Sequence, residues 1–225
     1  SKENIGVVYQ ADDFFRSGPI MTIFNGVVES AARLGYCVSI GSKINGRDAS
    51  EIKIIEDRAV DGIVIVPPVE KNITDKIIHW KIPFVIANSA ENSDYDSIMC
   101  DDENGAAQAI KFLLELGHKR IAHISYESIH KSVVIRRNIY KKYMTKNALK
   151  PKIILKRRDK ALEADFIKLI KDYRPTAIFA YHDNIAWELY FICASLGIRI
   201  PDDLSIIGIN DCENDLEVIP ALSTV

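Results

Sequence analysis

Hydrophobic and polar positions along the chain follow two alternating periods. Short runs rich in β-branched residues have the length and composition of strands, and between them apolar residues recur every three or four positions, as on one face of a helix. The expected strands span residues 4–9, 36–41, 61–66, 83–87, 120–125, 152–155, 177–180 and 204–209. The expected helices span residues 21–34, 49–57, 73–80, 104–116, 135–146, 162–173 and 184–196.

Strands and helices that alternate in this way predict an α/β fold with parallel sheets, helices on both faces and right-handed crossovers. Gly35, Gly117 and Gly197 each follow an expected helix, where a residue that tolerates positive φ makes a good end. No Gly/Ser linker or strong internal repeat marks a domain boundary. Periodicity therefore leaves open whether the strands form one wide sheet or two small ones.

Two of the expected strands end abruptly in pairs of polar residues. His182 and Asp183 follow the strand at 177–180, and Asn210 and Asp211 follow the strand at 204–209. Parallel sheets present ligand contacts at the carboxyl ends of their strands. The pattern therefore predicts a small-molecule site at these strand ends.

Composition limits the class of protein. The chain has 225 residues, 48% of them hydrophobic, and its 29 basic and 31 acidic residues give a formal charge of −2. This balance argues against a polyanion-binding domain, so we expect no nucleic acid to contact this part of the protein. No run is long and apolar enough for a membrane helix, and residues 1–6 do not have the pattern of a secretory signal. We expect a soluble, cytoplasmic protein.

The cysteines and the search for catalytic motifs point away from metal and enzyme chemistry. Four cysteines are scattered without metal-ligand spacing among apolar neighbours, which predicts reduced, buried thiols; they are Cys37, Cys100, Cys193 and Cys212. The sequence has no GxSxG, P-loop, HExxH or GxGxxG motif. Two carboxylate pairs, at 12–13 and 101–102, are adjacent residues, and we expect one inward and one outward side chain in each. We therefore expect no enzyme activity, metal or cofactor.

Several segments occur in the order found in one known family. They span residues 4–8, 60–64, 116–122, 175–180, 196–198, 200–208 and 220–225. Taken together, they make the chain resemble the effector-binding core of LacI/GalR family transcriptional regulators, whose fold is that of type I periplasmic sugar-binding proteins. The resemblance covers nearly the whole chain. It implies two doubly wound parallel-sheet subdomains with a ligand cleft between them.

The resemblance also implies how the chain is divided and what it works with. Residues 1–116 would form the N-terminal subdomain and residues 117–225 most of the C-terminal one. Family members carry a DNA-binding helix-turn-helix before this core and a further strand and helix after it, so we expect this chain to be a fragment that cannot bind an operator by itself. A homodimer that responds to a small effector is the implied assembly.

Arg136 lies where the family has an arginine that binds effector hydroxyls or carboxylates. A planar guanidinium can grip two adjacent oxygens. The alternative is an exposed charge on a helix face, because Arg137, Lys141 and Lys142 follow closely.

The two polar pairs correspond to family ligand positions as well. His182 and Asp183 replace an Asn-Asp pair, and Asp183 can either contact the ligand or cap a helix that begins at Asn184. Asn210 and Asp211 replace paired aspartates, and Asn210 removes a charge and weakens an acceptor for sugar hydroxyls.

The remaining candidates concern the character of the effector. Lys160 stands where the family often has a stacking aromatic; with Arg136 and Arg158 it suggests an anionic effector such as a sugar acid or sugar phosphate, and the alternative is a solvated run of charges. Phe14 and Phe15 lie in an expected loop and could supply a stacking face or form a lid. The weaker candidates are Asn88, with its neighbour Ser89, and Asp101.

The sequence thus predicts the ligand-sensing domain of a LacI/GalR-type regulator that binds a sugar or sugar-derived effector. The competing interpretation is a periplasmic-type solute-binding protein for transport or chemoreception, which shares the fold and the cleft. The segments at 116–121 and 201–205 are more typical of regulators. An enzyme-linked sensor would require an additional catalytic domain.

Overall fold

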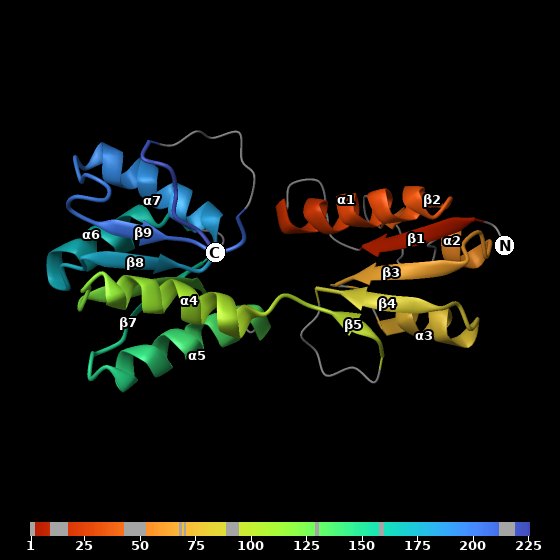
Figure 1. Cartoon of the computed structure of the whole chain (residues 1–225), viewed down its shortest axis with the longest axis horizontal. Helices are drawn as coiled ribbons and strands as arrows, with labels where there is room; N and C mark the ends of the chain where they lie inside the picture. Colours follow the sequence, from red (N-terminus) through yellow and green to blue (C-terminus); the bar gives the residue numbers. More distant parts are fainter. Residues whose placement is uncertain are drawn as a thin grey trace. The chain divides into compact units, whose positions relative to one another are not determined.

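A computed structural model gives the architecture of the chain (Figure 1). It describes residues 3–9, 18–42, 53–67, 69, 71–88, 95–128, 131–157, 160–211 and 219–225. The chain divides into two compact units, Ser1–Cys100 and Asp101–Val225. Each unit has its own parallel sheet, so the strands form two small sheets and not one wide one.

The described part of the first unit contains a sheet of five parallel strands in the order β2-β1-β3-β4-β5. Its strands are β1 (Asn4–Tyr9), β2 (Cys37–Ser42), β3 (Gly62–Val66), β4 (Phe84–Ala87) and β5 (Ser97–Ile98). Its helices are α1 (Gly18–Arg33), α2 (Lys53–Glu56) and α3 (Lys71–His79). Neighbours in β1 face opposite sides of the sheet: Val7 packs with α1, and Val8 packs in the cluster that contains Ile73 and Ile77 of α3. Helices therefore cover both faces, as a buried parallel sheet requires.

The described part of the second unit contains a sheet of four parallel strands in the order β7-β6-β8-β9. Its strands are β6 (Ile121–Tyr126), β7 (Lys152–Lys156), β8 (Ala177–Ala180) and β9 (Ser205–Ile207). Its helices are α4 (Asp102–Glu115), α5 (Lys131–Lys146), α6 (Glu163–Asp172) and α7 (Asp183–Ser195). The last residues of the chain run beside β9, where the N–H groups of Gly208 and Asn210 donate to the carbonyls of Ser223 and Val225.

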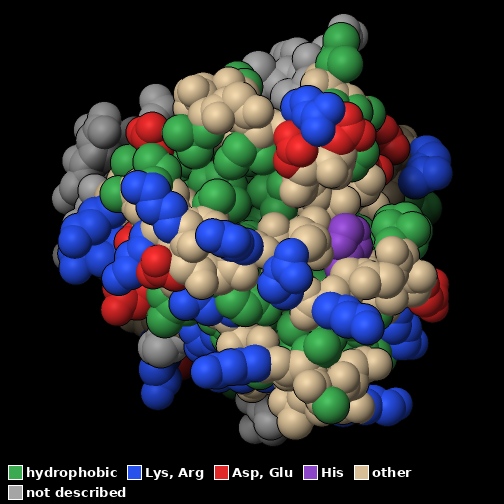
Figure 2. All heavy atoms as spheres, turned by 90° about the vertical axis from the view of Figure 1, so that its left-hand side faces the viewer, with side chains coloured by type: hydrophobic (Ala, Val, Ile, Leu, Met, Phe, Trp, Pro, Cys, Tyr) green, Lys and Arg blue, Asp and Glu red, His purple; other side chains and the backbone are tan. Residues whose placement is uncertain are grey.

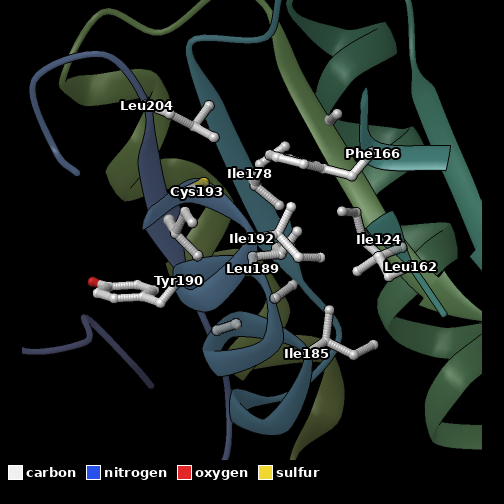
Figure 3. Packing of buried hydrophobic residues seen from close by; sticks show 14 of the residues in the cluster. Ile124, Leu162, Phe166, Ile178, Ile185, Leu189, Tyr190, Ile192, Cys193 and Leu204 are labelled. Atoms are coloured by element: carbon white, nitrogen blue, oxygen red, sulfur yellow. The ribbon is translucent and has the colours of Figure 1, made fainter. Parts of the chain in front are cut away.

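The core of the second unit lies on the two faces of this sheet. On one face, Ile124 and Ile178 of the sheet pack with Phe166 of α6 and Leu189 of α7 (Figure 3). On the other face, α4 and α5 contribute residues such as Ile110 and Tyr140. Fully apolar strands such as β8, in which all four residues are buried, suit this doubly covered position.

All eight strands that the pattern predicts are present in the structure. The predicted and observed elements differ mainly in the residues at which they begin and end. The additional strand β5 has only two residues, both exposed, and carries no alternating signal. Helices α1 and α5 begin earlier than expected, at Gly18 and Lys131. Gly35, Gly117 and Gly197 have φ values of 78°, 87° and 69°, which confirms the helix ends predicted there.

The division between the units lies sixteen residues before the expected one, between Cys100 and Asp101 instead of after residue 116. The reason is the packing of α4. Its apolar face, with Ala106, Ile110 and Leu113, forms one cluster with residues of α5 and the second sheet. The expected boundary had assigned this helix to the first unit.

Basic side chains gather on the face of the second unit shown in Figure 2. Lys119 and Arg120 precede β6, Lys150 precedes β7 and Arg174 precedes β8, and all four are exposed. Two of these loops touch, because Nε of Arg120 donates to the carbonyl of Arg174 at 2.7 Å. Helices α4, α5 and α6 end at this edge of the sheet, where positive charge complements the helix dipoles.

The environments of the cysteines differ from the prediction of buried thiols. Cys37 and Cys100 are exposed and Cys193 is buried, while Cys212 lies outside the described residues. Cys37 opens the edge strand β2, and Cys100 is the last residue of the first unit, so apolar neighbours in the sequence did not bring burial. Along the described chain no helix is long and apolar enough to cross a membrane.

This difference predicts selective thiol chemistry. Burial raises the pKa of Cys193 to about 11, so its reactive thiolate is scarce near neutral pH. In a Cys212→Ser background we expect a thiol reagent such as Ellman's reagent to modify Cys37 and Cys100 in the folded chain, and Cys193 only after denaturant is added. Reaction of all three thiols at equal rates in the folded chain would contradict the described burial.

Candidate functional site

Strand ends in the second unit bring the predicted polar residues to one edge of the sheet. β6, β8 and β9 are parallel, so the residues that follow them lie at the same edge. Tyr126 ends β6, Tyr181 and His182 follow β8, and Asn210 follows β9. Arg136 reaches this edge from α5.

Arg136 joins three separate elements of the unit. Its side chain is 6% exposed. Nε donates to Oδ1 of Asp102, at the start of α4, at 2.7 Å, and Nη1 donates to the carbonyl of Tyr181 at 2.6 Å. Nη2 donates to Oδ1 of Asn210 at 3.0 Å and lies 2.7 Å from Asp102 Oδ1. The alternative of an exposed helix-face charge is therefore wrong for Arg136, because this residue lies on the inner side of α5.

Asn210 and Asp211 face different surroundings although they are adjacent. Both have positive φ, 111° and 44°, which asparagine and aspartate tolerate better than most residues. The Asn210 side chain turns to Arg136. Asp211 is exposed, and its backbone N–H donates to Oγ1 of Thr224 at 3.2 Å. Of this pair, the structure brings only Asn210 into the cluster around Arg136.

His182 and Asp183 also have separate positions. His182 is the N-cap of α7, and its Nδ1 accepts from the N–H of Ile185 at 3.3 Å. Asp183 is the first helical residue, so the cap lies one residue earlier than the sequence predicted. Asp183 is 1% exposed, and its Oδ1 accepts from Oγ1 of Thr224 at 2.8 Å. The same carboxylate occupies the space that a Cβ on residue 208 would need, so only glycine fits there. Asp183 therefore contacts both Gly208, which follows β9, and Thr224, near the end of the chain.

Three aromatic side chains of this edge lie together, and sequence reasoning did not select two of them. The ring centroids of Tyr126 and Tyr181 are 5.9 Å apart, those of Tyr126 and His182 5.3 Å, and those of Tyr181 and His182 5.1 Å. The Arg136 guanidinium lies 4.8 Å from the centroid of the Tyr181 ring. Tyr181 directly precedes the predicted pair, and Tyr126 ends a strand, but neither position has a polar motif that would mark it.

The other predicted positions lie elsewhere or have another contact. Lys160 is exposed and follows the edge strand β7. Its carbonyl accepts from Nζ of Lys156, which also pairs with Glu188 of α7 at 3.3 Å. Phe14, Phe15, Ser89 and Arg158 lie outside the described residues.

Asp101 and Asn88 show structural contacts. Asp101 is the exposed N-cap of α4 and accepts from the N–H of Asn104 at 3.0 Å, whereas Asp102 is buried. One carboxylate of this pair therefore points inward and one outward, as predicted. Asn88 follows β4 with φ 60° and lines a hollow of about 650 Å³ in the first unit, together with apolar residues such as Val27 of α1 and Val85 of β4.

A buried histidine lies behind the site on β6. The ring of His123 stacks on Phe179 at 4.6 Å and lies 5.2 Å from the ring of Tyr140. Its Nδ1 is 2.9 Å from the carbonyl oxygen of Phe179, which can only accept, so Nδ1 carries the proton. Neither Nε2 of His123 nor Oγ of Ser125 has a hydrogen-bond partner among the described residues. Burial lowers the pKa of His123 to about 4, and the Phe179 carbonyl opposes this shift.

The chain has two parallel α/β units, and polar residues gather at the carboxyl ends of the strands in the second unit. This combination is typical of the class of α/β proteins that bind ligands at strand ends. Comparisons with known proteins agree. Residues 110–225 match the family of periplasmic binding protein-like domains. A curated relative, the HTH-type transcriptional repressor PurR of Vibrio atlanticus (strain LGP32), is 29% identical over 216 residues, which cover 90% of this chain and 64% of that protein. The chain thus spans less than two thirds of the length of this relative.

Solved structures show the same fold. A regulatory protein of the LacI family from Chloroflexus aggregans is 23% identical and superposes with a TM-score of 0.79, covering 100% of this chain and 84% of that one. A LacI family transcriptional regulator from Enterococcus faecium with bound ribose is 22% identical, with a TM-score of 0.81 and coverages of 98% and 82%. The chain belongs to the family of periplasmic binding protein-like domains. The resemblance seen in the sequence and the expected fold class are both confirmed.

Proposed function

We propose that this chain senses a small sugar or sugar-derived effector for a LacI/GalR-type transcriptional regulator. The observation that carries the proposal is the cluster around Arg136, which joins the start of α4 to the ends of β8 and β9. Strand ends of this kind are where parallel α/β folds hold ligands. The ribose bound to the regulator from Enterococcus faecium supports a sugar, and the curated relative, a transcriptional repressor, supports a regulator over a transport receptor.

The relative named PurR makes a purine-type compound a second candidate for the effector. Both candidates are compact ring compounds with several hydrogen-bonding groups. A binding panel that contains sugars and purine bases separates them directly.

The switch in this proposal is a change in population between two conformations. An effector shifts such an equilibrium only by the difference in its affinity for the two states. Asp102 lies two residues after the boundary between the units, so a ligand that alters the Arg136–Asp102 contact acts where the chain passes from one unit to the other. We propose that the regulator works as a homodimer in the cytoplasm and binds DNA through a helix-turn-helix segment.

The test is a thermal-shift panel of neutral sugars, sugar acids, sugar phosphates and purine bases with the 225-residue chain. We expect at least one compound to raise the unfolding temperature, because a ligand that binds only the folded state stabilises it. Asn210→Ala should abolish the shift, and Asp203→Ala, which removes an exposed carboxylate paired with Arg199, should preserve it. Recovery of the bound compound unchanged is the expected sign of binding without catalysis. No shift with any member of the panel would refute the proposal.

A further inference from the structure

Two polar side chains of β6 are completely enclosed and make no hydrogen bond to the described part of the protein. His123 and Ser125 are both 0% exposed, and the unpaired atoms are Nε2 of His123 and Oγ of Ser125. Most buried polar atoms in folded proteins have a partner, which is either another protein group or an ordered water. Leaving such an atom unpaired is costly, so two of them on one strand need a physical explanation.

Both side chains face the same side of the second sheet. They are two residues apart on β6, and side chains along a strand alternate between its two faces. Ile121 lies on the same face and packs in the cluster formed with α4 and α5, and the His123 ring lies against Tyr140 of α5. The two unpaired atoms therefore belong to one buried layer, between the second sheet and these two helices.

The contacts of the His123 ring determine what its second nitrogen requires. The ring stacks on Phe179, and Nδ1 donates to the carbonyl of the same residue at 2.9 Å. In a neutral imidazole the nitrogen without the proton can only accept. Nε2 of His123 therefore needs a hydrogen-bond donor, and this donor must lie inside the buried layer.

Ser125 carries a hydroxyl in that layer, but the structure shows no direct hydrogen bond between the two side chains. Successive positions on one face of a strand are about 6.6 Å apart, which is twice the rise per residue. One water molecule with hydrogen bonds of about 2.8 Å on either side spans a gap of this order. A water could therefore satisfy both atoms without any change in the strand.

The surroundings favour water over a cation. Within the described ranges, no group of three or more His, Cys, Asp or Glu side chains could hold a metal ion. Burial lowers the pKa of His123, and the positive charges of Arg136 and Arg137 add to this shift. The same charges would repel a cation bound at Nε2. Water is uncharged, and it can both donate and accept.

We propose that an ordered water molecule binds between Nε2 of His123 and Oγ of Ser125 and bridges them inside the second unit. The water donates one hydrogen to Nε2 and forms a second hydrogen bond with the Ser125 hydroxyl. A buried water needs at least two polar partners, and these atoms supply them. Ser125 directly precedes Tyr126, the last residue of β6, so the water stabilises the core behind the edge that carries the candidate site.

A crystal structure of the 225-residue chain at neutral pH, at a resolution that shows ordered waters, tests the proposal directly. We expect a water about 2.8 Å from both atoms. Direct contact between Nε2 and Oγ, a water bonded to only one of them, or no water between them would overturn the proposal. An ion about 2.0–2.1 Å from Nε2, the length of a bond between zinc and histidine, would overturn it as well.

Urea unfolding of variants tests the bridge in solution. Ser125→Ala removes one partner of the water, and we expect it to raise the unfolding equilibrium constant about tenfold, which corresponds to about 1.4 kcal/mol. In a His123→Phe background the water has already lost its acceptor. The same substitution should then change the equilibrium constant by less than about twofold, because the two effects are coupled through the water.

Ser205→Ala is the matched control. Ser205 is a serine of β9 in the same sheet, and β8 separates it from β6. Its effect should be the same in the parent chain and in the His123→Phe background, since effects at separate sites add. Equal losses for Ser125→Ala in the two backgrounds would show that Ser125 and His123 are not linked, and the bridge would be rejected. Unequal losses support the water only together with the crystal structure, because a direct hydrogen bond would couple the residues too.

Discussion

Replacing Asp102 by alanine should lower the free energy of unfolding of the second unit by about 3–5 kcal/mol, the cost of leaving one partner of a buried ion pair alone. The Arg136 side chain is 6% exposed, and in the variant its guanidinium would lose the carboxylate with which it pairs. Its bonds to the Tyr181 carbonyl and to Asn210 do not compensate for a charge. The same ion pair ties α4 to α5, so the loss should fall on the whole unit.

The measurement is urea unfolding of the Asp102→Ala chain followed by the fluorescence of Trp187. Trp187 lies in α7 and is 7% exposed, so it reports on the second unit, and a Trp80→Phe background removes the signal of the first. Glu103→Ala is the matched control, because Glu103 is an exposed acid in the same first turn of α4 and has the same relation to the helix dipole.

Two further results would decide how the loss is interpreted. Asp203→Ala removes an exposed partner of Arg199 and should leave the unfolding curve almost unchanged, since exposed pairs are screened by solvent. A loss below about 1 kcal/mol for Asp102→Ala, as for a surface pair, would show that Arg136 is not buried against this carboxylate.

The strands could be predicted from the sequence because burial on both faces leaves a strong local signal. β3 and β8 consist almost entirely of apolar residues between turns, and β1 has Val7 and Val8 in two different core clusters. β5 could not be found in this way, since its two exposed residues are fixed by pairing with β4 alone. The expected boundary after residue 116 differs from the observed one for a related reason. The sequence of α4 shows that the helix has an apolar face, but it does not show which of the two sheets that face covers.

The candidate site was predictable only in part. Resemblance placed Arg136 and Asn210, and strand topology explains why they meet. Asp102 and Tyr181 were missed because they reach Arg136 from 34 and 45 residues away, a distance no local pattern bridges. The carboxylate pair 101–102 was correctly expected to point two ways, although the cause is the start of α4 and not the alternation of a strand.

His123 should make the stability of the second unit depend on pH between about 4 and 6.5. Burial lowers its pKa in the folded chain from 6.5 to about 4. Between these values the unfolded chain binds more protons than the folded chain, so the free energy of unfolding rises with pH. The stability that the neutral His123 contributes is fully present above the pKa of the unfolded chain, 6.5. It is lost as the pH falls toward the pKa of the folded chain, about 4. A difference of this size corresponds to about 3 kcal/mol.

The variant His123→Phe isolates this effect. Phenylalanine can keep the stacking on Phe179 and Tyr140 but cannot bind a proton, so its unfolding free energy should be flatter between these pH values than that of the parent chain. Only the difference between the two curves is assigned to His123, because His118 in the same unit also has a pKa lowered by burial. Parallel curves would mean that His123 is accessible to protons in the folded unit. Urea unfolding at a series of pH values, again followed by Trp187, separates these cases. A buried, neutral His123 requires the free energy of unfolding of the parent chain to fall relative to that of the variant as the pH is lowered from about 6.5 to about 4.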